Sequence, residues 1–353
     1  LMTSESSQLN IGITLEQALK GQPGYEQDER VRTEVDAVFD KLLTLNKENK
    51  QRELLEALRE LKEKLKKIYA FVADHDLPSP PETIGDFEGL EDDEILNNLE
   101  KQYGARLETM KYFEIIDDIN NPVITGIDNQ TYPAPTWEEI KGSLNLAEYK
   151  KFKKPTLLIT PIGMSLKDLT EKVTSKKGNL EAQNPVNTSW DLDADKSGDL
   201  VYFPEKYEKD NHGGKTKQKL IDEAIGGFKG WQVTVVEGER EISRERIIKD
   251  PNATENKDKY KNAHEFLAEH NNEGLVGLTP EENLMLHAEG VRQGEAFNTD
   301  NWEWLLGAYL NKLGSVPRSY WDPAFRKLVL HKIAPEAFDF GLGPRRAARV
   351  SKS

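Results

Sequence analysis

Asn301–Trp302–Glu303–Trp304–Leu305–Leu306–Gly307 is the stretch that decides the fold expected for the second half of this 353-residue chain. The sequence around it stays aromatic without a helical or strand period: Tyr309, Tyr320, Trp321, Phe325, Phe338 and Phe340, punctuated by Gly314, Gly341 and Gly343. Bulky rings between glycines predict a loop-rich domain held together by a few buried aromatic side chains. We expect Trp302, Trp304 and Trp321 to pack in its core.

A helix is expected directly before this segment. Thr279 has the side-chain oxygen of an N-cap residue, and Pro280 suits the first helical position. Glu282 stands where the acidic partner of a capping box belongs. The sequence therefore predicts a helix from Pro280 to Arg292.

The middle of the chain alternates strand-like runs with helical patterns. β-branched and aromatic runs bounded by Pro, Gly or Asp predict strands at 112–119, 156–162, 200–203 and 231–236. Apolar periodicity predicts helices at 137–144, 166–173 and 217–225, and another at 263–270 within a charged surface excursion over 241–276. These elements predict an α+β fold for residues 106–353, of which 277–353 form the loop-rich tail.

The N-terminal region, residues 1–105, has a different pattern. Apolar residues recur at alternating spacings of four and three in two blocks, 31–45 and 54–72, separated by a polar break. Such spacing predicts two amphipathic helices, and the short break predicts an antiparallel helical hairpin. An acidic, Pro-rich linker over 78–93 follows it. The hairpin is either a self-contained module or a surface for self-association.

Charge and composition exclude several classes of protein. The chain contains no cysteine, which excludes disulfides, thiolate metal sites and thiol catalysis and fits a cytoplasmic protein. No apolar run is long enough to span a membrane, and no signal sequence is evident at the start. The net charge of −14 argues against nucleic-acid and anionic-membrane partners for the chain as a whole.

The charge is unevenly distributed along the chain. The stretch 312–353 has nine basic and three acidic residues, which leaves about −20 on the remainder. This basic tail either docks on the acidic remainder of its own chain or forms a basic binding face.

Segments that resemble catalytic motifs do not have the residue spacing that those motifs require. His264 and His270 are six residues apart, so they cannot share the helix face that a zinc-protease motif needs. The segment 212–216 (HGGKT) ends like a phosphate-binding loop, but Lys209 stands where that loop needs its first glycine. No Ser nucleophile signature is present. The sequence therefore points more toward binding than toward catalysis.

An acidic segment resembles a calcium loop without completing one. Its candidate metal ligands alternate along the chain: Asp191, Asp193, Asp195 and Asp199. Alternating oxygen ligands suit a hard cation, but Lys196 replaces the required glycine and Tyr202 replaces the bidentate glutamate. Calcium is the one cofactor that the sequence leaves open, and a solvated acidic turn is the alternative.

Three ordered segments carry a resemblance to a known fold. They are NWEWLLG at 301–307, VPRSYWD at 316–322 and the closing GPRRAARV at 343–350. Together they resemble the C-type-lectin-like fold of formylglycine-generating enzymes and of the variable proteins of diversity-generating retroelements. Upstream, the segments at 155–166 (PTLLITPIGMSL), 200–204 and 212–216 look similar to uncharacterised proteins from small-genome bacteria. The resemblance covers roughly residues 150–353.

The resemblance implies a ligand-binding face on irregular surface residues before the closing strand. Mapped onto this chain, that face comprises Arg318, Ser319, Tyr320, Asp322, Arg326, Lys327, Leu328, Leu330, His331 and Lys332. The absence of cysteine departs from the enzyme branch of the family. The absence of asparagine between Tyr320 and Phe340 departs from an actively diversified tail, so a static relative is also consistent.

The sequence thus favours a non-enzymatic protein that binds a protein or small-molecule ligand through this face. Two alternatives remain open. One is an enzyme or metal-binding protein working from Asp191–Asp199 and His212, which requires Asp193, Asp195 and His212 to meet in one pocket. The other is an assembly protein that acts through the N-terminal hairpin.

Overall fold

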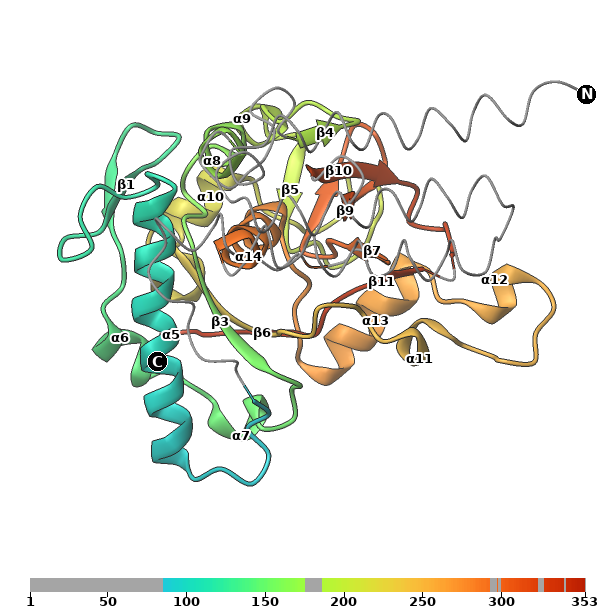
Figure 1. The fold of residues 1–353 in the computed structure, drawn as a ribbon. Coiled ribbons are helices and arrows are strands. Elements are labelled where there is room, and N and C mark those ends of the chain that lie inside the picture. The colour runs from blue at the N-terminus through green and yellow to red at the C-terminus, as the bar shows by residue number, and fades with distance from the viewer. Residues whose placement is uncertain are drawn as a thin grey trace, which may run out of the picture. The chain divides into compact units, whose positions relative to one another are not determined.

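The computed structural model describes residues 85–174, 186–292, 297, 300–322, 327–339 and 341–352. They belong to one compact unit that begins at Pro81. The predicted N-terminal hairpin and most of the linker lie outside the described residues. Figure 1 shows the arrangement of the helices and strands.

Helix α14 (Pro280–Arg292) is the centre of the unit. Its start matches the predicted capping box, because the Thr279 N–H donates to Glu282 at 2.8 Å and the Glu282 N–H donates to the Thr279 hydroxyl at 3.2 Å. Every residue from Gly277 to Gly290 is buried. The helix therefore has no solvated face, although it contains charged residues.

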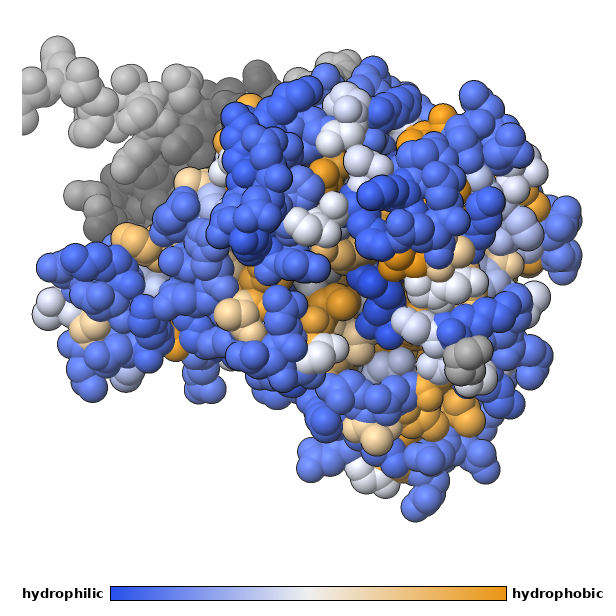
Figure 2. All heavy atoms as spheres, turned by 180° about the vertical axis from the view of Figure 1, so that it is seen from behind, coloured by the Kyte–Doolittle hydropathy of each residue, from blue (hydrophilic) through white to orange (hydrophobic). Residues whose placement is uncertain are grey.

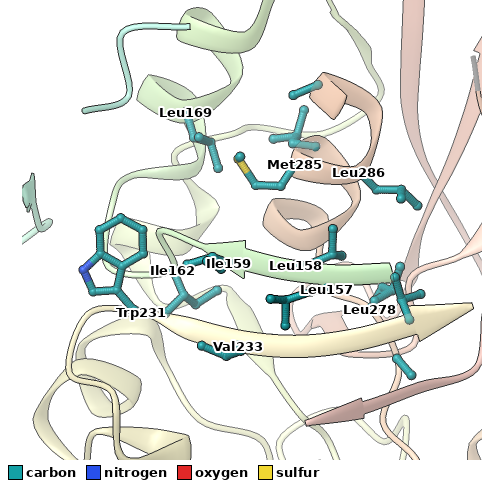
Figure 3. Packing of buried hydrophobic residues seen from close by; sticks show 14 of the residues in the cluster. Leu157, Leu158, Ile159, Ile162, Leu169, Trp231, Val233, Leu278, Met285 and Leu286 are labelled. Carbon is teal, nitrogen blue, oxygen red and sulfur yellow. The ribbon is translucent and has the colours of Figure 1, made fainter. Parts of the chain in front are cut away.

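A three-stranded antiparallel sheet packs against one side of α14. Its strand order is β12 (Ala347–Arg349), β6 (Gln232–Glu237), β3 (Pro155–Thr160). Helices α5 (Asp92–Tyr112) and α14 contact β3, and α8 (Leu166–Thr174) packs on α14, where Met285 points toward Leu169 above Leu158 (Figure 3). The strand β3 is buried along its whole length, as expected for a strand with helices on its surface.

A five-stranded mixed sheet lies against another side of α14. Its order is β11 (Leu342–Gly343), β7 (Trp302–Trp304), β9 (Val316–Asp322), β10 (Lys327–Ile333), β4 (Val186–Thr188). The inner face of this sheet contacts α14, since Asn283 donates to Glu303 at 3.2 Å. Part of the outer face packs with helix α13 (Ala263–Glu273) through Trp304 and Phe266.

Smaller elements complete the unit. The helices are α5 (Asp92–Tyr112), α6 (Trp137–Lys141), α7 (Leu146–Tyr149), α9 (Ala194–Ser197), α10 (Lys217–Asp222), η1 (Ile225–Gly227), α11 (Arg244–Ile247) and α12 (Asn256–Lys259). The strands β1 (Val123–Thr125) and β2 (Thr131–Pro133) form one two-stranded sheet, and β5 (Leu200–Tyr202) pairs with β8 (Ala308–Leu310) in another. None of the described helices is long and apolar enough to cross a membrane.

The α+β class is confirmed, and so are the cores of most predicted elements. The strand prediction for 112–119 is wrong, because Tyr112 ends α5 and the following residues form turns. The predicted boundary at residue 105 falls inside α5, which packs on β3 and belongs to the same unit. The helix predicted from Pro280 to Arg292 is confirmed as α14. The rest of the tail 277–353 is more regular than predicted, because it contributes strands to both main sheets.

The surface opposite the view of Figure 1 is mostly hydrophilic, and hydrophobic atoms gather in a hollow near its centre (Figure 2). Leu313 and Phe338 are the large hydrophobic residues most exposed in the described part of the chain, at 46% and 38%. Most apolar side chains therefore lie in the interior, as in a stable folded unit.

Buried charges fix α14 to distant parts of the chain. The Lys217 ammonium group of α10 is fully buried and lies 2.6 Å from Asp195 and 2.8 Å from Glu281. The Tyr202 hydroxyl also donates to Glu281, at 2.6 Å. At the other end of the helix, Glu289 pairs with Arg106 of α5 at 2.5 Å. Each pair joins elements that are far apart in the sequence.

We expect Lys217→Met to destabilise the protein by about 3–5 kcal/mol, because it leaves two buried carboxylates without their cation. The free energy of unfolding from urea denaturation measures the effect. Lys219→Met is the matched control: Lys219 lies on the same helix, is exposed, and should change stability by less than about 0.5 kcal/mol. Equal losses in both variants would contradict a structural role for the buried ammonium group.

Candidate functional site

The predicted ligand-binding residues lie on β9 and β10, which form a regular antiparallel pair. Arg318 pairs with His331, Ser319 with Leu330, and Tyr320 with Val329. Because side chains alternate between the two faces of a strand, these residues divide between the inner and the outer face of the sheet. The prediction of one irregular surface is therefore corrected by the strand pairing.

Three of the predicted ligand-binding residues are on the inner face of the sheet and are buried there. Ser319, Leu328 and Leu330 are 0%, 4% and 0% exposed. Trp321 is on the same face and stacks on the buried ring of His287, with 6.1 Å between ring centroids. These four side chains contact α14 or the core, so we assign them to packing.

The outer face brings together an aromatic and cationic group of side chains, which we call the outer-face cluster: Trp302, Arg318, Tyr320 and His331. Trp302 stacks on Tyr320 with 5.1 Å between centroids, and its centroid lies 5.6 Å from that of His331. The Arg318 guanidinium lies 4.0 Å from the Trp302 ring centroid. All four side chains are half-buried, so each ring or cation keeps a surface open to solvent.

Arg318 has no carboxylate within salt-bridge distance among the described residues. Its Nε is buried and lacks a hydrogen-bond partner there. Burial lowers the pKa of the guanidinium, and the more distant charge of Asp339 partly opposes this shift. The cluster therefore holds a cation whose hydrogen-bonding capacity is not used by the described part of the fold.

The other two members of the cluster are affected by burial and by nearby charges. Burial lowers the pKa of His331, and the neighbouring Arg318 lowers it further. Burial raises the pKa of Tyr320, as do nearby acidic residues including Asp322. At neutral pH His331 is therefore uncharged and Tyr320 keeps its proton, so both can donate hydrogen bonds.

The remaining predicted ligand-binding residues lie at the ends of β9 and β10 or outside the described residues. Asp322 is half-exposed at the end of β9, and Lys332 is half-exposed near the end of β10. The backbone of Lys327 pairs with Asp322, and Arg326 lies outside the described residues. The cluster retains Arg318, Tyr320 and His331 from the predicted set.

Sequence reasoning missed Trp302, which we expected in the core with Trp304. Trp304 is fully buried, whereas Trp302, two residues earlier on the same face of β7, is only partly buried against the same hydrophobic cluster. The two tryptophans have the same strand parity, so the alternation of side chains along the strand does not distinguish them. No local sequence pattern predicts this difference in burial between Trp302 and Trp304.

The carboxylates of the acidic loop have partners in the chain itself. Asp195 caps α8 by accepting the Leu166 N–H at 2.7 Å and pairs with Lys217. Asp193 pairs with Lys167 at 3.1 Å and with Lys196 at 3.4 Å. No group of three or more His, Cys, Asp or Glu side chains that could hold a metal ion is present in the described part of the chain.

The remaining members of the proposed alternative site also have local structural partners. Asp191 accepts the Asp193 N–H at 3.0 Å, and Asp199 accepts the Lys312 N–H at 2.6 Å. His212 accepts the N–H of Gly214 at 2.9 Å. Their partners are turns and helix ends, so these contacts organise backbone and do not converge on a reacting atom.

Three of the basic residues of the tail pair with acidic residues of their own chain. Arg345 contacts Glu303 at 3.3 Å, Arg346 contacts Glu273 at 3.2 Å, and Lys352 contacts Glu139 at 2.9 Å. For these three residues the first of the two interpretations of the charge asymmetry holds. Arg318 is an exception, because its guanidinium lies on an aromatic ring instead of a carboxylate.

Comparison with known proteins gives no match: no family model, curated protein or solved structure is similar to this chain.

We expect His287→Phe to make folding stability less dependent on pH. Burial, reinforced by Arg345, lowers the pKa of His287 to about 3, so the unfolded chain binds a proton below pH ~6.5 that the folded chain does not. Stability should therefore fall as the pH drops, and wild type should lose about 2 kcal/mol more than His287→Phe between pH 7 and 5.

Urea unfolding at the two pH values measures this difference. Phe297→Leu is the control, because Phe297 packs on the His287 ring and has no titrating group. That variant should lose stability at both pH values yet keep the pH dependence of wild type. A His287→Phe variant with an unchanged pH dependence would contradict the assignment of His287 as a buried neutral side chain.

Proposed function

We propose that this chain is a cytoplasmic, non-enzymatic binding protein with a C-type-lectin-like fold, and that the outer-face cluster binds its partner. One observation carries the proposal. The Arg318 guanidinium lies over Trp302 with no carboxylate in salt-bridge range among the described residues. Arginine, tryptophan and tyrosine are the residue types that contribute most to binding at protein interfaces.

The support for a binding role comes from rigidity as well as composition. Arg318, Tyr320 and His331 belong to paired strands, and Trp302 belongs to the adjacent strand of the same sheet. The inner face of that sheet is buried against α14, which limits movement of the outer face. A surface that is ordered before binding loses less conformational entropy when the partner binds.

The chemistry of the cluster favours a partner with a carboxylate next to an apolar or aromatic group. A guanidinium donates hydrogen bonds in its own plane, so stacking on Trp302 leaves its edge available for an oxyanion. Phe338, at 38% exposure, lies one residue before Asp339, whose charge acts on Arg318. An acidic segment of a partner protein that contains an aromatic residue fits these properties.

The fold assignment rests on the ordered segments at 301–307, 316–322 and 343–350. Two of them supply adjacent strands, β7 and β9, and the third supplies the closing strand β12. This arrangement is consistent with a lectin-like domain in which core strands present a variable surface. The region 316–333 would then be a diversified surface or a static descendant of one.

A phage-displayed random peptide library, selected on the full chain, tests the binding proposal. We expect wild type to enrich peptides that contain acidic and aromatic residues. Arg318→Met should weaken binding of the enriched peptides by about tenfold to a hundredfold, because an interface hot spot contributes about 1.4–3 kcal/mol. Arg318→Lys should fall between the two, since it keeps the charge and loses the stacking.

Lys312→Met is the matched control, because Lys312 is an exposed basic residue of the same tail and lies outside the cluster. It should bind the peptides as wild type does. A library that enriches the same peptides on wild type and on the double variant Trp302→Ala/Arg318→Met would overturn the proposal. So would a library that enriches nothing on wild type.

Sequencing the locus across many cells of one population tests whether the surface is diversified. Because β9 and β10 are paired, tolerated non-synonymous changes should concentrate at the outward positions 318, 320, 322 and 331. Codons 319, 328 and 330 should stay constant, since their side chains fill the core. Uniformly low variation over 316–333 would contradict diversification and leave a static binding surface.

A further inference from the structure

A pocket of about 450 Å³ lies beside the small β1–β2 sheet. One wall is the continuous segment 130–135, which contains β2, and another is the segment 227–229. Its volume is within the range of pockets that bind ligands, about 300–1,000 Å³. The pocket therefore has room for a ligand, and its lining residues determine which kind of ligand fits.

The pocket meets β2 along one edge of the strand. Thr131, Tyr132 and Pro133 all line it. Because successive side chains of a strand point to opposite faces, a pocket on one face would touch only alternate residues. The structure describes all of β1, and none of its residues lines the pocket. The pocket therefore lies along the edge of β2 that does not pair with β1.

The backbone groups on this edge have no partner in the described part of the chain. The Ala134 N–H donates to the Pro122 carbonyl at 2.8 Å, so Ala134 forms its hydrogen bond on the β1 side. In an antiparallel pair such positions alternate, so Tyr132 also bonds toward β1, whereas Thr131 and Pro133 point their backbone groups outward. The N–H and carbonyl of Thr131 and the carbonyl of Pro133 are unpaired among the described residues. Such an edge is a template for pairing with another strand.

Contacts with the core fix the walls of the pocket. The Trp231 indole N–H donates to the Tyr132 carbonyl at 3.0 Å. The Tyr132 ring packs directly on Gly230, where an added Cβ would come within 2.5 Å of the ring. The Tyr132 hydroxyl donates to Asp128 at 2.5 Å. A strand edge held in this way is ordered before a ligand arrives, so less conformational entropy is lost on binding.

The unpaired charge at the pocket is positive. Lys229 is exposed, lies 5.7 Å from the Tyr132 ring centroid and has no carboxylate within salt-bridge distance among the described residues. Glu139, the other charged residue of the lining, already pairs with Lys352 at 2.9 Å and accepts the Thr136 N–H at 2.9 Å. An anionic group on the ligand is therefore complementary to the pocket.

We propose that β2 is a docking strand for an extended segment of a partner protein, which adds to its free edge and carries an acidic side chain next to Lys229. The backbone of that segment donates to the carbonyls of Thr131 and Pro133 and accepts the Thr131 N–H. In strand addition the main-chain hydrogen bonds supply affinity and the side chains supply selectivity.

This docking strand is separate from the outer-face cluster. The β1–β2 sheet shares no strand with the five-stranded sheet. Figure 1 shows β1, the partner of β2, far from β9 and β10. The proposal therefore adds a second binding site to the protein and does not depend on the first.

An array of capped six-residue peptides, overlaid with the labelled full chain, supplies the probes. Exchange of the Thr131 amide hydrogen with water, measured by NMR, then locates the binding of each selected peptide. We expect this amide to exchange rapidly in the free protein and about tenfold or more slowly with at least one of the selected peptides. A peptide bound at the outer-face cluster leaves this exchange unchanged, so the two proposals can fail separately.

N-methylated versions of a protecting peptide test the main-chain hydrogen bonds. Methylation of the alternate amides that face β2 should abolish the protection of Thr131. Methylation of the intervening amides, which point away from β2, should preserve it. This difference identifies strand addition, because side-chain binding does not depend on which set of amides is methylated.

Lys229→Glu tests the charge preference. It should weaken binding of acidic protecting peptides by about threefold to tenfold, as expected for the reversal of an exposed ion pair. The same peptides with lysine in place of the acidic residue should bind this variant more tightly than they bind wild type. Lys141→Glu is the matched control, because Lys141 is exposed on α6 and does not line the pocket. It should bind as wild type does.

Four results would overturn the proposal. The first is a Thr131 amide that is already protected in the free full chain, since the edge would then be occupied by this chain or by a second copy. The second is an array in which no peptide slows its exchange. The third is an equal loss of protection for both methylation patterns. The fourth is a charge preference that Lys229→Glu leaves unchanged, or that Lys141→Glu changes as much.

Discussion

The burial of a charged helix is the constraint on which the rest of this structure depends. Helix α14 has no solvated face, yet Glu281, Glu282 and Glu289 are all buried within it. A buried carboxylate is tolerated only when cations or hydrogen-bond donors surround it. Lys217 and Arg106 supply the cations from α10 and α5, and Thr234 supplies a hydroxyl from β6. α14 can be buried only if α10, α5 and β6 place these groups next to its carboxylates.

This constraint also explains why the proposed binding surface can be rigid. The five-stranded sheet is attached to α14 by Asn283, which donates to Glu303, and by His287, which stacks on Trp321. With the inner face fixed by polar contacts of defined geometry, the outward side chains of the same strands have fixed positions. Trp302 and Arg318 therefore present their stacked arrangement without rearrangement of the backbone.

The two stacked arginines differ from the rest of the basic tail in a consistent way. Where a guanidinium serves the fold, as in Arg345 and Arg346, it contacts carboxylates and carbonyl oxygens in the same molecule. Arg345 and Arg346 also lie over rings, at 5.2 Å from Phe297 and 5.5 Å from Phe152. Arg318 and Arg349 lie closer to their rings, at 4.0 and 3.7 Å, and have no carboxylate within salt-bridge distance among the described residues. Arg318 lies in the outer-face cluster, whereas Arg349 lies on β12 and its Nε and Nη2 atoms are buried.

The sequence by itself determined what depends on neighbours along the chain: the α14 capping box at Thr279 and Glu282, the β-branched runs that became β3 and β6, and the aromatic core around Trp304. The tertiary structure decided what depends on long-range contacts. Strand pairing places Ser319 and Leu330 on the inner face and Arg318 and His331 on the outer face, and tertiary packing buries Trp304 fully and Trp302 only in part. Likewise, Asp195 of the acidic 191–199 segment pairs with Lys217 of α10, a partner that the spacing of the acidic residues does not predict. Local propensity acts over a few residues, whereas the face and the partner of a side chain are set by elements distant in sequence.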